Sequence, residues 1–110
     1  MAKDTMAKDT LLTPDQMKTS LNDLNSQALE PWVVDDGKLH RRYKFSGFSV
    51  AFAFMTQVAM VCERMEHHPK WTNVWNVVDV DLLTHRSKGI TTLDMEMAVA
   101  MENIARQYLS

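Results

Sequence analysis

The segment from Phe48 to Glu66 constrains the fold more than any other part of this 110-residue chain. At about 100° per residue, its apolar side chains cover an arc of about 200°, whereas a helix that faces a core needs only about 100°. The arc holds Val50, Ala51, Phe52, Phe54, Met55, Val58, Ala59, Val61, Cys62 and Met65. We therefore expect a central helix that packs against a sheet and also against a second subunit.

The composition narrows the class of protein. The chain has 12 Lys and Arg against 14 Asp and Glu, a net charge of −2, which argues against direct nucleic-acid binding. A hydrophobic content of 45% argues against an acidic disordered chain. The single cysteine, Cys62, permits no internal disulfide, so we expect a reducing compartment, the cytoplasm. Charges or amides interrupt every apolar run and no signal-peptide core is present, so we expect no membrane segment.

The first ten residues, MAKDTMAKDT, are one five-residue unit written twice. Nothing in this unit can form a core, so we predict that residues 1–10 are a disordered leader. Residues 11–110 then form a single domain. A domain of this size buries only about two-thirds of its unfolded surface, so its core is marginal alone and favours an oligomer.

Capping residues predict where the first helix begins. Thr13 suits the N-cap, Pro14 suits the first helical position, and Gln16 stands where a capping box places Glu or Gln. We expect this helix to end near residues 25–27.

A hairpin is expected next. Pro31 opens an extended stretch, and the Asp-Asp-Gly-Lys sequence of residues 35–38 is typical of a tight turn. Residues 39–45 alternate apolar and polar side chains, as a half-buried strand does. Arg41 interrupts the apolar face, so we expect this strand at an edge of the sheet or at an interface.

The second half of the chain contains a β-rich segment and a last helix. Within residues 71–84, apolar side chains alternate with Asp79 and Asp81. Thr91 is the expected N-cap of the last helix, and Asp94 stands where a capping box places its acid. The order helix, two strands, helix, one or two strands, helix predicts an α+β fold with helices on one face of an antiparallel sheet.

The densest group of residues capable of acid–base chemistry precedes Pro69. Glu63 and His67 are four apart, which places them on one helix face, and His68 follows at the predicted helix end. A third imidazole, His85, stands at the end of a predicted strand, where loops gather into clefts. Imidazole titrates near pH about 6.5, so several in one pocket can divide the roles of general acid and general base.

Simpler interpretations of the same residues stay open. His67 or His68 could complement the negative end of a helix dipole, and Asp94 could serve only as a cap. Trp71 could fill the core instead of stacking on a planar ligand, and His40 is expected to be solvated on the polar face of its strand.

A metal-dependent enzyme is a further alternative. Glu63 and three histidines are acceptable zinc ligands, but the spacing lacks paired cysteines and the His-Glu-x-x-His motif. The adjacent His67 and His68 also point in different directions, so both cannot easily bind one ion. We therefore expect no metal site.

Three stretches of the sequence carry a resemblance to a known family. They read Phe54-Met55-Thr56-Gln57-Val58-Ala59, Glu63-x-x-x-His67-His68-Pro69-x-Trp71-x-Asn73-Val74-x-Asn76 and Thr84-His85-x-x-x-Gly89-Ile90-Thr91-x-x-Asp94. Over residues 11–107 the chain resembles the pterin-4a-carbinolamine dehydratases. Mammalian members of this family also act as the dimerisation cofactor of a hepatocyte nuclear factor.

The resemblance implies a four-stranded antiparallel sheet with three helices packed on one face, in the order α-β-β-α-β-β-α. It also implies homodimers that join sheets and homotetramers built through helices. The implied reaction dehydrates 4a-hydroxytetrahydrobiopterin to quinonoid dihydrobiopterin and water, without a cofactor, in tetrahydrobiopterin recycling. A non-enzymatic dimerisation or transcriptional cofactor on the same fold is the alternative, acting with a protein partner in the cytoplasm or the nucleus.

The resemblance also assigns site residues. The residues carried over are His67, His68 and His85 as catalytic imidazoles, with Glu63, Trp71, Thr84 and Asp94 in supporting or binding positions. We expect His68 and His85 to form the acid and base pair, and His67 to bind the substrate and protonate the leaving oxygen. Lys70 and Arg86 depart from residues common in the family, where acids are frequent, and add positive charge beside the imidazoles.

Overall fold

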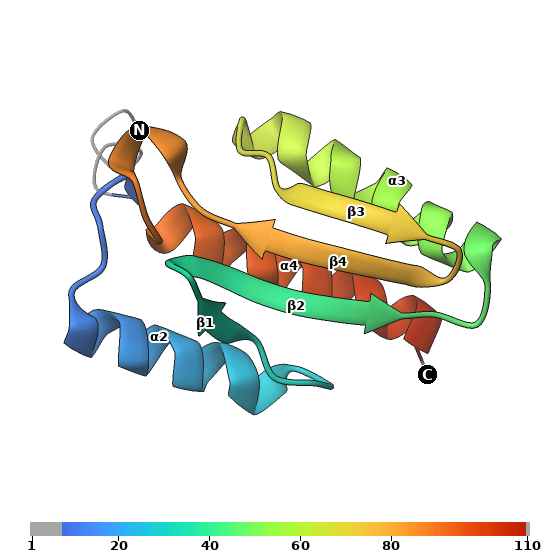
Figure 1. Cartoon of the computed structure of the whole chain (residues 1–110), viewed down its shortest axis with the longest axis horizontal. Helices are drawn as coiled ribbons and strands as arrows, with labels where there is room; N and C mark the ends of the chain where they lie inside the picture. The colour runs from blue at the N-terminus through green and yellow to red at the C-terminus, as the bar shows by residue number, and fades with distance from the viewer. Residues whose placement is uncertain (1–7, 110) are drawn as a thin grey trace.

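The computed structural model describes residues 8–109 and has an α+β architecture (Figure 1). Its elements are α2 (Pro14–Gln27), β1 (Val33–Asp35), β2 (Lys38–Lys44), α3 (Phe48–Met65), β3 (Lys70–Val74), β4 (Val77–Leu82), the 3-10 turn η1 (His85–Ser87) and α4 (Thr92–Leu109). The predicted fold class and element order are confirmed. Residues 1–7 of the predicted leader lie outside the described residues.

The four strands form one antiparallel sheet in the order β1-β2-β4-β3. Side chains alternate between a buried face, beneath which α3 and α4 lie, and a polar face. Two cross-strand ion pairs cover the polar face: His40 Nδ1 lies 2.9 Å from Asp81 Oδ1, and Arg42 Nε lies 2.8 Å from Asp79 Oδ1. The polar face therefore stays in water and the opposite face forms the core.

The position of β2 agrees in part with the prediction. β2 lies between β1 and β4, but β1 pairs with it only at residues 38–40, so β2 has an open edge from Arg41 onward. Arg41 is buried beneath the sheet at 3% exposure. Arg41 Nε donates to Glu102 Oε2 on α4 at 3.0 Å. Arg41 therefore interrupts the apolar face where β2 has an open edge, as the sequence predicts, and an acid on a distant helix neutralises its charge.

Glu102 is the centre of a closed polar cluster in the core. Its carboxylate is fully buried and accepts hydrogen bonds from Arg41 Nε, from Trp32 Nε1 at 3.0 Å and from the Tyr43 hydroxyl. Burial and the neighbouring Glu102 carboxylate raise the pKa of Tyr43 far above its ordinary value. This cluster joins α4 to β2 and to the segment that precedes β1.

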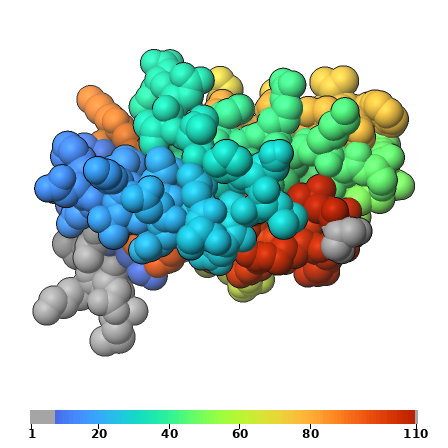
Figure 2. Space-filling model, turned by 90° about the horizontal axis from the view of Figure 1, so that it is seen from below, coloured from blue at the N-terminus to red at the C-terminus, as the bar shows by residue number. Residues whose placement is uncertain are grey.

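Local sequence signals set the first helix and the hairpin as predicted. Gln16 N donates to Thr13 Oγ1 at 3.2 Å and Thr13 N donates to Gln16 Oε1 at 2.9 Å, so the capping box is present. Asp36 and Gly37 have φ of 53° and 73°, the left-handed pair that a tight hairpin turn requires. Helix α2 lies against α4, and the two are side by side in blue and red in Figure 2.

Helix α3 buries one side and exposes another, as its wide apolar arc predicts. Ala51, Phe54, Val58 and Cys62 are buried in the core, and burial raises the pKa of the Cys62 thiol. The exposed apolar residues of this helix include Phe48, Phe52 and Met60. With 18 residues and a mean hydropathy of 1.2, α3 also meets the length and composition expected of a membrane span. We interpret it as the core helix, because its buried side packs against β4 and α4.

Candidate active site

The site begins where α3 ends, at Met65, one residue before the predicted helix end at Glu66. Glu66 adopts the left-handed conformation with φ of 51°, and the backbone N–H of His67 donates to Cys62 O at 3.1 Å. His67 and His68 therefore lie in the connection to β3 rather than on the last turn of the helix. The chain turns at Glu66 before Pro69 can end the helix.

Glu63 contacts a different histidine from the predicted one. Glu63 Oε1 lies 3.3 Å from His68 Nε2, and both side chains are exposed. The prediction that Glu63 and His67 share a helix face was wrong, because His67 is no longer helical. Glu63 therefore pairs with the exposed imidazole and leaves His67 to another acid.

That other acid is Asp94, which caps α4 as the sequence predicts. Asp94 Oδ2 accepts from the backbone N–H of Thr91 at 2.9 Å, and Thr91 Oγ1 accepts from the N–H of Leu93 at 3.2 Å. Both are reciprocal contacts of a helix N-terminus, where a carboxylate is favourable. The cap fixes the Asp94 carboxylate in place without using Oδ1.

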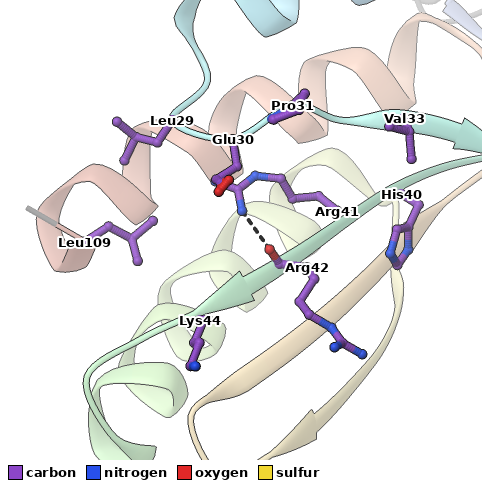
Figure 3. Close-up of a pocket in the computed structure, with 9 residues that line it drawn as sticks. All are labelled: Leu29, Glu30, Pro31, Val33, His40, Arg41, Arg42, Lys44 and Leu109. Atoms are coloured by element: carbon purple, nitrogen blue, oxygen red, sulfur yellow. Dashed lines mark hydrogen bonds between the residues drawn. The ribbon is translucent and has the colours of Figure 1, made fainter.

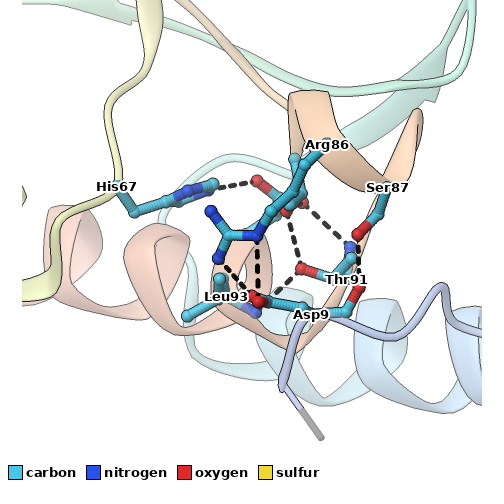
Figure 4. Close-up of polar contacts among 8 residues, drawn as sticks. Asp9, His67, Arg86, Ser87, Thr91 and Leu93 are labelled. Carbon is cyan, nitrogen blue, oxygen red and sulfur yellow. Dashed lines mark hydrogen bonds and ion pairs between the residues drawn. The ribbon is translucent and has the colours of Figure 1, made fainter. Parts of the chain in front are cut away.

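The same carboxylate holds His67 and Thr84, as Figure 4 shows for His67. His67 Nε2 lies 2.6 Å from Asp94 Oδ1, and Thr84 Oγ1 donates to Asp94 Oδ2 at 2.9 Å. Thr84 also lies 2.7 Å from Thr91 between the two hydroxyl oxygens. His67 is 7% exposed, and Thr84 and Asp94 are buried. Asp94 is therefore both a cap and the anchor of an imidazole.

The three histidines come from two segments that meet at Asp94. His68 follows His67 directly, and His85 follows Thr84 directly as the first residue of η1. His67 is buried, whereas His68 and His85 are exposed. One fixed imidazole is thus next to an accessible one in the sequence, and a second accessible imidazole follows Thr84, which shares the Asp94 carboxylate with His67. Such a set of imidazoles can divide acid and base roles.

Trp71 and His40, which the sequence analysis also considered, do not belong to this cluster. Trp71 is on β3 opposite Val80, and its half-buried side chain packs against the core. His40 is on the polar face of the sheet, paired with Asp81. The packing of Trp71 favours the core-filling interpretation of that residue.

Residues 8–12 make contacts that the sequence does not predict, and residues 8–10 were expected to belong to a disordered leader. Asp9 forms a two-point ion pair with Arg86, which follows His85 (Figure 4). The signal available was the second copy of the repeat, which supplies a Lys-Asp pair, together with the unusual charge of Arg86. Nothing local in the sequence links residues 77 positions apart.

The side chains that could bind a ligand at the site carry imidazole, hydroxyl and carboxylate groups. Among the described residues, no three His, Cys, Asp or Glu side chains are grouped so that they could hold a metal ion. A buried carboxylate that accepts from one imidazole nitrogen fixes the ring orientation and its tautomer. Fold and site thus define a small α+β protein with a histidine site suited to proton transfer.

Comparison with known proteins gives the family. The model of the pterin 4 alpha carbinolamine dehydratase family matches residues 10–104. A relative from Rhizorhabdus wittichii is 49% identical over 80 residues, 71% of this chain and 82% of its own. A relative from Brucella ovis is 44% identical over 96 residues, 86% of this chain and 94% of its own. Both carry the provisional name pterin-4-alpha-carbinolamine dehydratase.

A solved structure agrees. The crystal structure of a protein from Brucella melitensis, described as a transcriptional coactivator/pterin dehydratase, superposes with a TM-score of 0.77 at 43% sequence identity. The match covers 86% of this chain and 97% of that one. The chain belongs to the pterin 4 alpha carbinolamine dehydratase family, as its sequence resemblance indicated.

Proposed function

We propose that this protein dehydrates 4a-hydroxytetrahydropterins to quinonoid dihydropterins and water, by general acid and base catalysis. Such a step breaks the bond between C4a and the hydroxyl oxygen, protonates the leaving oxygen and removes the proton from N5. The observation that carries this proposal is the Asp94 carboxylate, which holds His67 at 2.6 Å and Thr84 at 2.9 Å. Family membership supports the same reaction.

Each histidine has a proposed role. An ionised Asp94 can only accept a hydrogen bond, so His67 Nε2 carries a proton and Nδ1 is left to contact the substrate. His67, protonated at both nitrogens, binds the substrate and gives its Nδ1 proton to the leaving oxygen. Of the accessible His68 and His85, one takes the proton from N5 and the other returns a proton to His67. Glu63 orients His68 from 3.3 Å. The reaction needs no redox partner, since water is the only group lost.

A stopped-flow assay with chemically generated carbinolamine tests this proposal. We expect acceleration over buffer that survives treatment with a chelator. His85→Ala should lower kcat by about 100-fold or more, the usual contribution of a general acid or base. His40→Ala is the matched control, because His40 lies on the polar face of the sheet, and it should retain the wild-type rate. No acceleration by the wild-type protein would contradict the enzyme proposal and favour a scaffold.

The protein is also proposed to act as a homo-oligomer. β1 pairs with β2 only over residues 38–40, so residues 41–44 of β2 have no strand on that side within the described chain. A hollow of about 710 Å³ lies there, bordered by Pro31, Val33 and Leu109 among others (Figure 3). An open edge of this kind accepts a strand from a second copy.

The exposed apolar side chains of α3 offer a second place for self-association. Phe48, Phe52 and Met60 are each more than half exposed, at 52%, 55% and 61%. Analytical ultracentrifugation at micromolar concentration should give more than one chain per particle. A monomer would contradict this part of the proposal and would leave the dehydration chemistry untouched.

A further inference from the structure

The turn that carries His85 is held by a segment from the far end of the chain. Arg86 Nε lies 2.9 Å from Asp9 Oδ2, and Arg86 Nη2 lies 2.6 Å from Asp9 Oδ1. The Ser87 hydroxyl donates to the backbone carbonyl of Asp9 (Figure 4). A two-point arginine–carboxylate pair fixes orientation as well as distance. Two of the three residues of η1 are therefore bonded to Asp9.

The rest of the segment is attached on both sides of Asp9. Lys8 Nζ lies 3.2 Å from Glu96 Oε2 on α4. The backbone N–H of Leu12 donates to Ile90 O at 3.1 Å, and Leu11 forms a bridge with Thr91. Residues 8–12 therefore run from α4 across the loop between Thr84 and Thr91, and we call them the strap.

Gly89 shows how closely the strap fits the loop. A Cβ added at Gly89 would lie 2.8 Å from Leu11 Cδ2, closer than real contacts of this kind. The loop closes on itself through Thr84 N, which donates to Gly89 O at 2.8 Å. The strap thus contacts the loop at two places: Asp9 contacts the η1 turn, and Leu11 lies against Gly89.

We propose that Asp9 is a positioning residue for His85, acting through Arg86 and the η1 turn. This inference rests on the proposed function, in which His85 exchanges a proton with the substrate. η1 is only three residues long and its side chains are exposed or half-buried, so little packing of its own fixes the imidazole. Small errors in the position of a catalytic group lower the rate steeply. The Asp9 carboxylate also balances the Arg86 charge next to His85.

The proposal gives a role to the described part of the second MAKDT unit. Lys8 and Asp9 belong to the second MAKDT unit, and both side chains are paired, with Glu96 and Arg86 respectively. The departure of Arg86 from the acids common at this place then has a partner within the same chain. Without Asp9, Arg86 would add an unpaired positive charge beside His85. With Asp9, Arg86 attaches the η1 turn to the strap.

Asp9→Asn in the full chain tests the proposal. We expect kcat to fall by roughly 3- to 10-fold, with KM within about twofold of wild type, since the loss concerns proton transfer rather than binding. The midpoint of thermal unfolding should not change, because the pair is on the surface. The matched control is Lys8→Gln, which removes only the Glu96 contact and should leave kcat at the wild-type value.

A double-mutant cycle shows whether Asp9 acts through Arg86. Asp9→Asn, Arg86→Gln and the double variant should lose about the same activity, because residues that act as a unit do not have additive effects. Additive losses would overturn the proposal, and so would a wild-type kcat in Asp9→Asn.

Amide hydrogen exchange provides a readout that does not depend on catalysis. In Asp9→Asn, the N–H groups of Lys88 and Gly89 should exchange faster, while those in the middle of α4 should not change. Unchanged exchange in the loop would overturn the positioning role, whatever the kinetics show. If the wild-type protein lacks dehydratase activity, the proposed function fails and the catalytic part of this inference with it. The exchange rates then still decide whether Asp9 holds the turn.

Discussion

Asp94 and Glu102 are two fully buried carboxylates on the same helix, and they have opposite surroundings. They are eight positions apart, about 12 Å along the helix axis at 1.5 Å per residue. Glu102 is surrounded by a guanidinium, a phenol and an indole, all of which are buried. Asp94 accepts from an imidazole, a hydroxyl and a backbone N–H beside two exposed histidines.

The surroundings of each carboxylate indicate its role. The Glu102 cluster is buried and consists of side chains from β2 and from the segment before β1, so it joins α4 to the sheet. The Asp94 cluster includes an imidazole and lies where two segments bring further imidazoles to the surface. A buried acid stabilises the fold in the first case and orients a proton carrier in the second.

Removing Glu102 should produce the largest effect. Glu102→Leu leaves Arg41 buried without its acid and should lower the free energy of unfolding by about 3–5 kcal/mol. Urea unfolding followed by circular dichroism measures the change. The paired variant Arg41→Met/Glu102→Leu removes both charges and should recover most of the loss, and it remains informative if the single variant does not fold. Equal losses in both variants would mean that the ion pair is not what joins α4 to the sheet.

Asp94→Asn should affect the reaction more than the fold. An amide cannot accept from His67 with one atom and from both Thr84 and the Thr91 N–H with the other, so the ring loses its fixed tautomer. We expect kcat to fall by about 100-fold, whereas weakening of the cap should lower the free energy of unfolding by only about 1 kcal/mol. The matched control is Asp79→Asn, the same chemical change on the polar face of the sheet, which should leave kcat unaltered. Loss of stability without loss of kcat would reduce Asp94 to a cap.

Asp79→Asn should have the smallest effect, visible only through pH. The hydrogen bonds from Arg42 hold the pKa of Asp79 below its ordinary value. A carboxyl with a lowered folded-state pKa stabilises the fold above its unfolded pKa of about 3.9, and this contribution is lost as the pH falls through the folded-state value. Urea unfolding at pH 6 should therefore give a slightly higher free energy of unfolding for the wild type than for the variant. This difference in free energy should disappear at acid pH. A gap that grows toward acid pH would contradict the sign.

Local patterns were enough to predict much of this fold. The Thr13 capping box, the turn at Gly37 and the alternation of β4 each depend on residues within a few positions of one another, and the structure has all three. The capping pair of Thr91 and Asp94 is of the same kind. Such features follow from backbone geometry that a short sequence determines.

The remaining features depend on partners far apart in the chain. In the sequence, Arg41 interrupts an apolar strand face without a visible partner. Its partner Glu102 is 61 positions further along the chain. His67 reads as the partner of Glu63 until the left-handed Glu66 turns the chain toward Asp94. Periodicity carries no information about either pairing. The sequence analysis singled out His67, Thr84 and Asp94, which the structure brings together, but the contacts among them required the structure.

Titration of histidine-labelled protein with a dihydropterin, followed by NMR, tests whether the histidines around Asp94 form one pterin site. His67, His68 and His85 should shift together with one dissociation constant, because they belong to one pterin site. His40 borders the hollow beside β2 and is the internal control, whose signal should not move. A shift of His40 with the other three unchanged would place the pterin in that hollow and contradict the assignment of the Asp94 cluster as the active site.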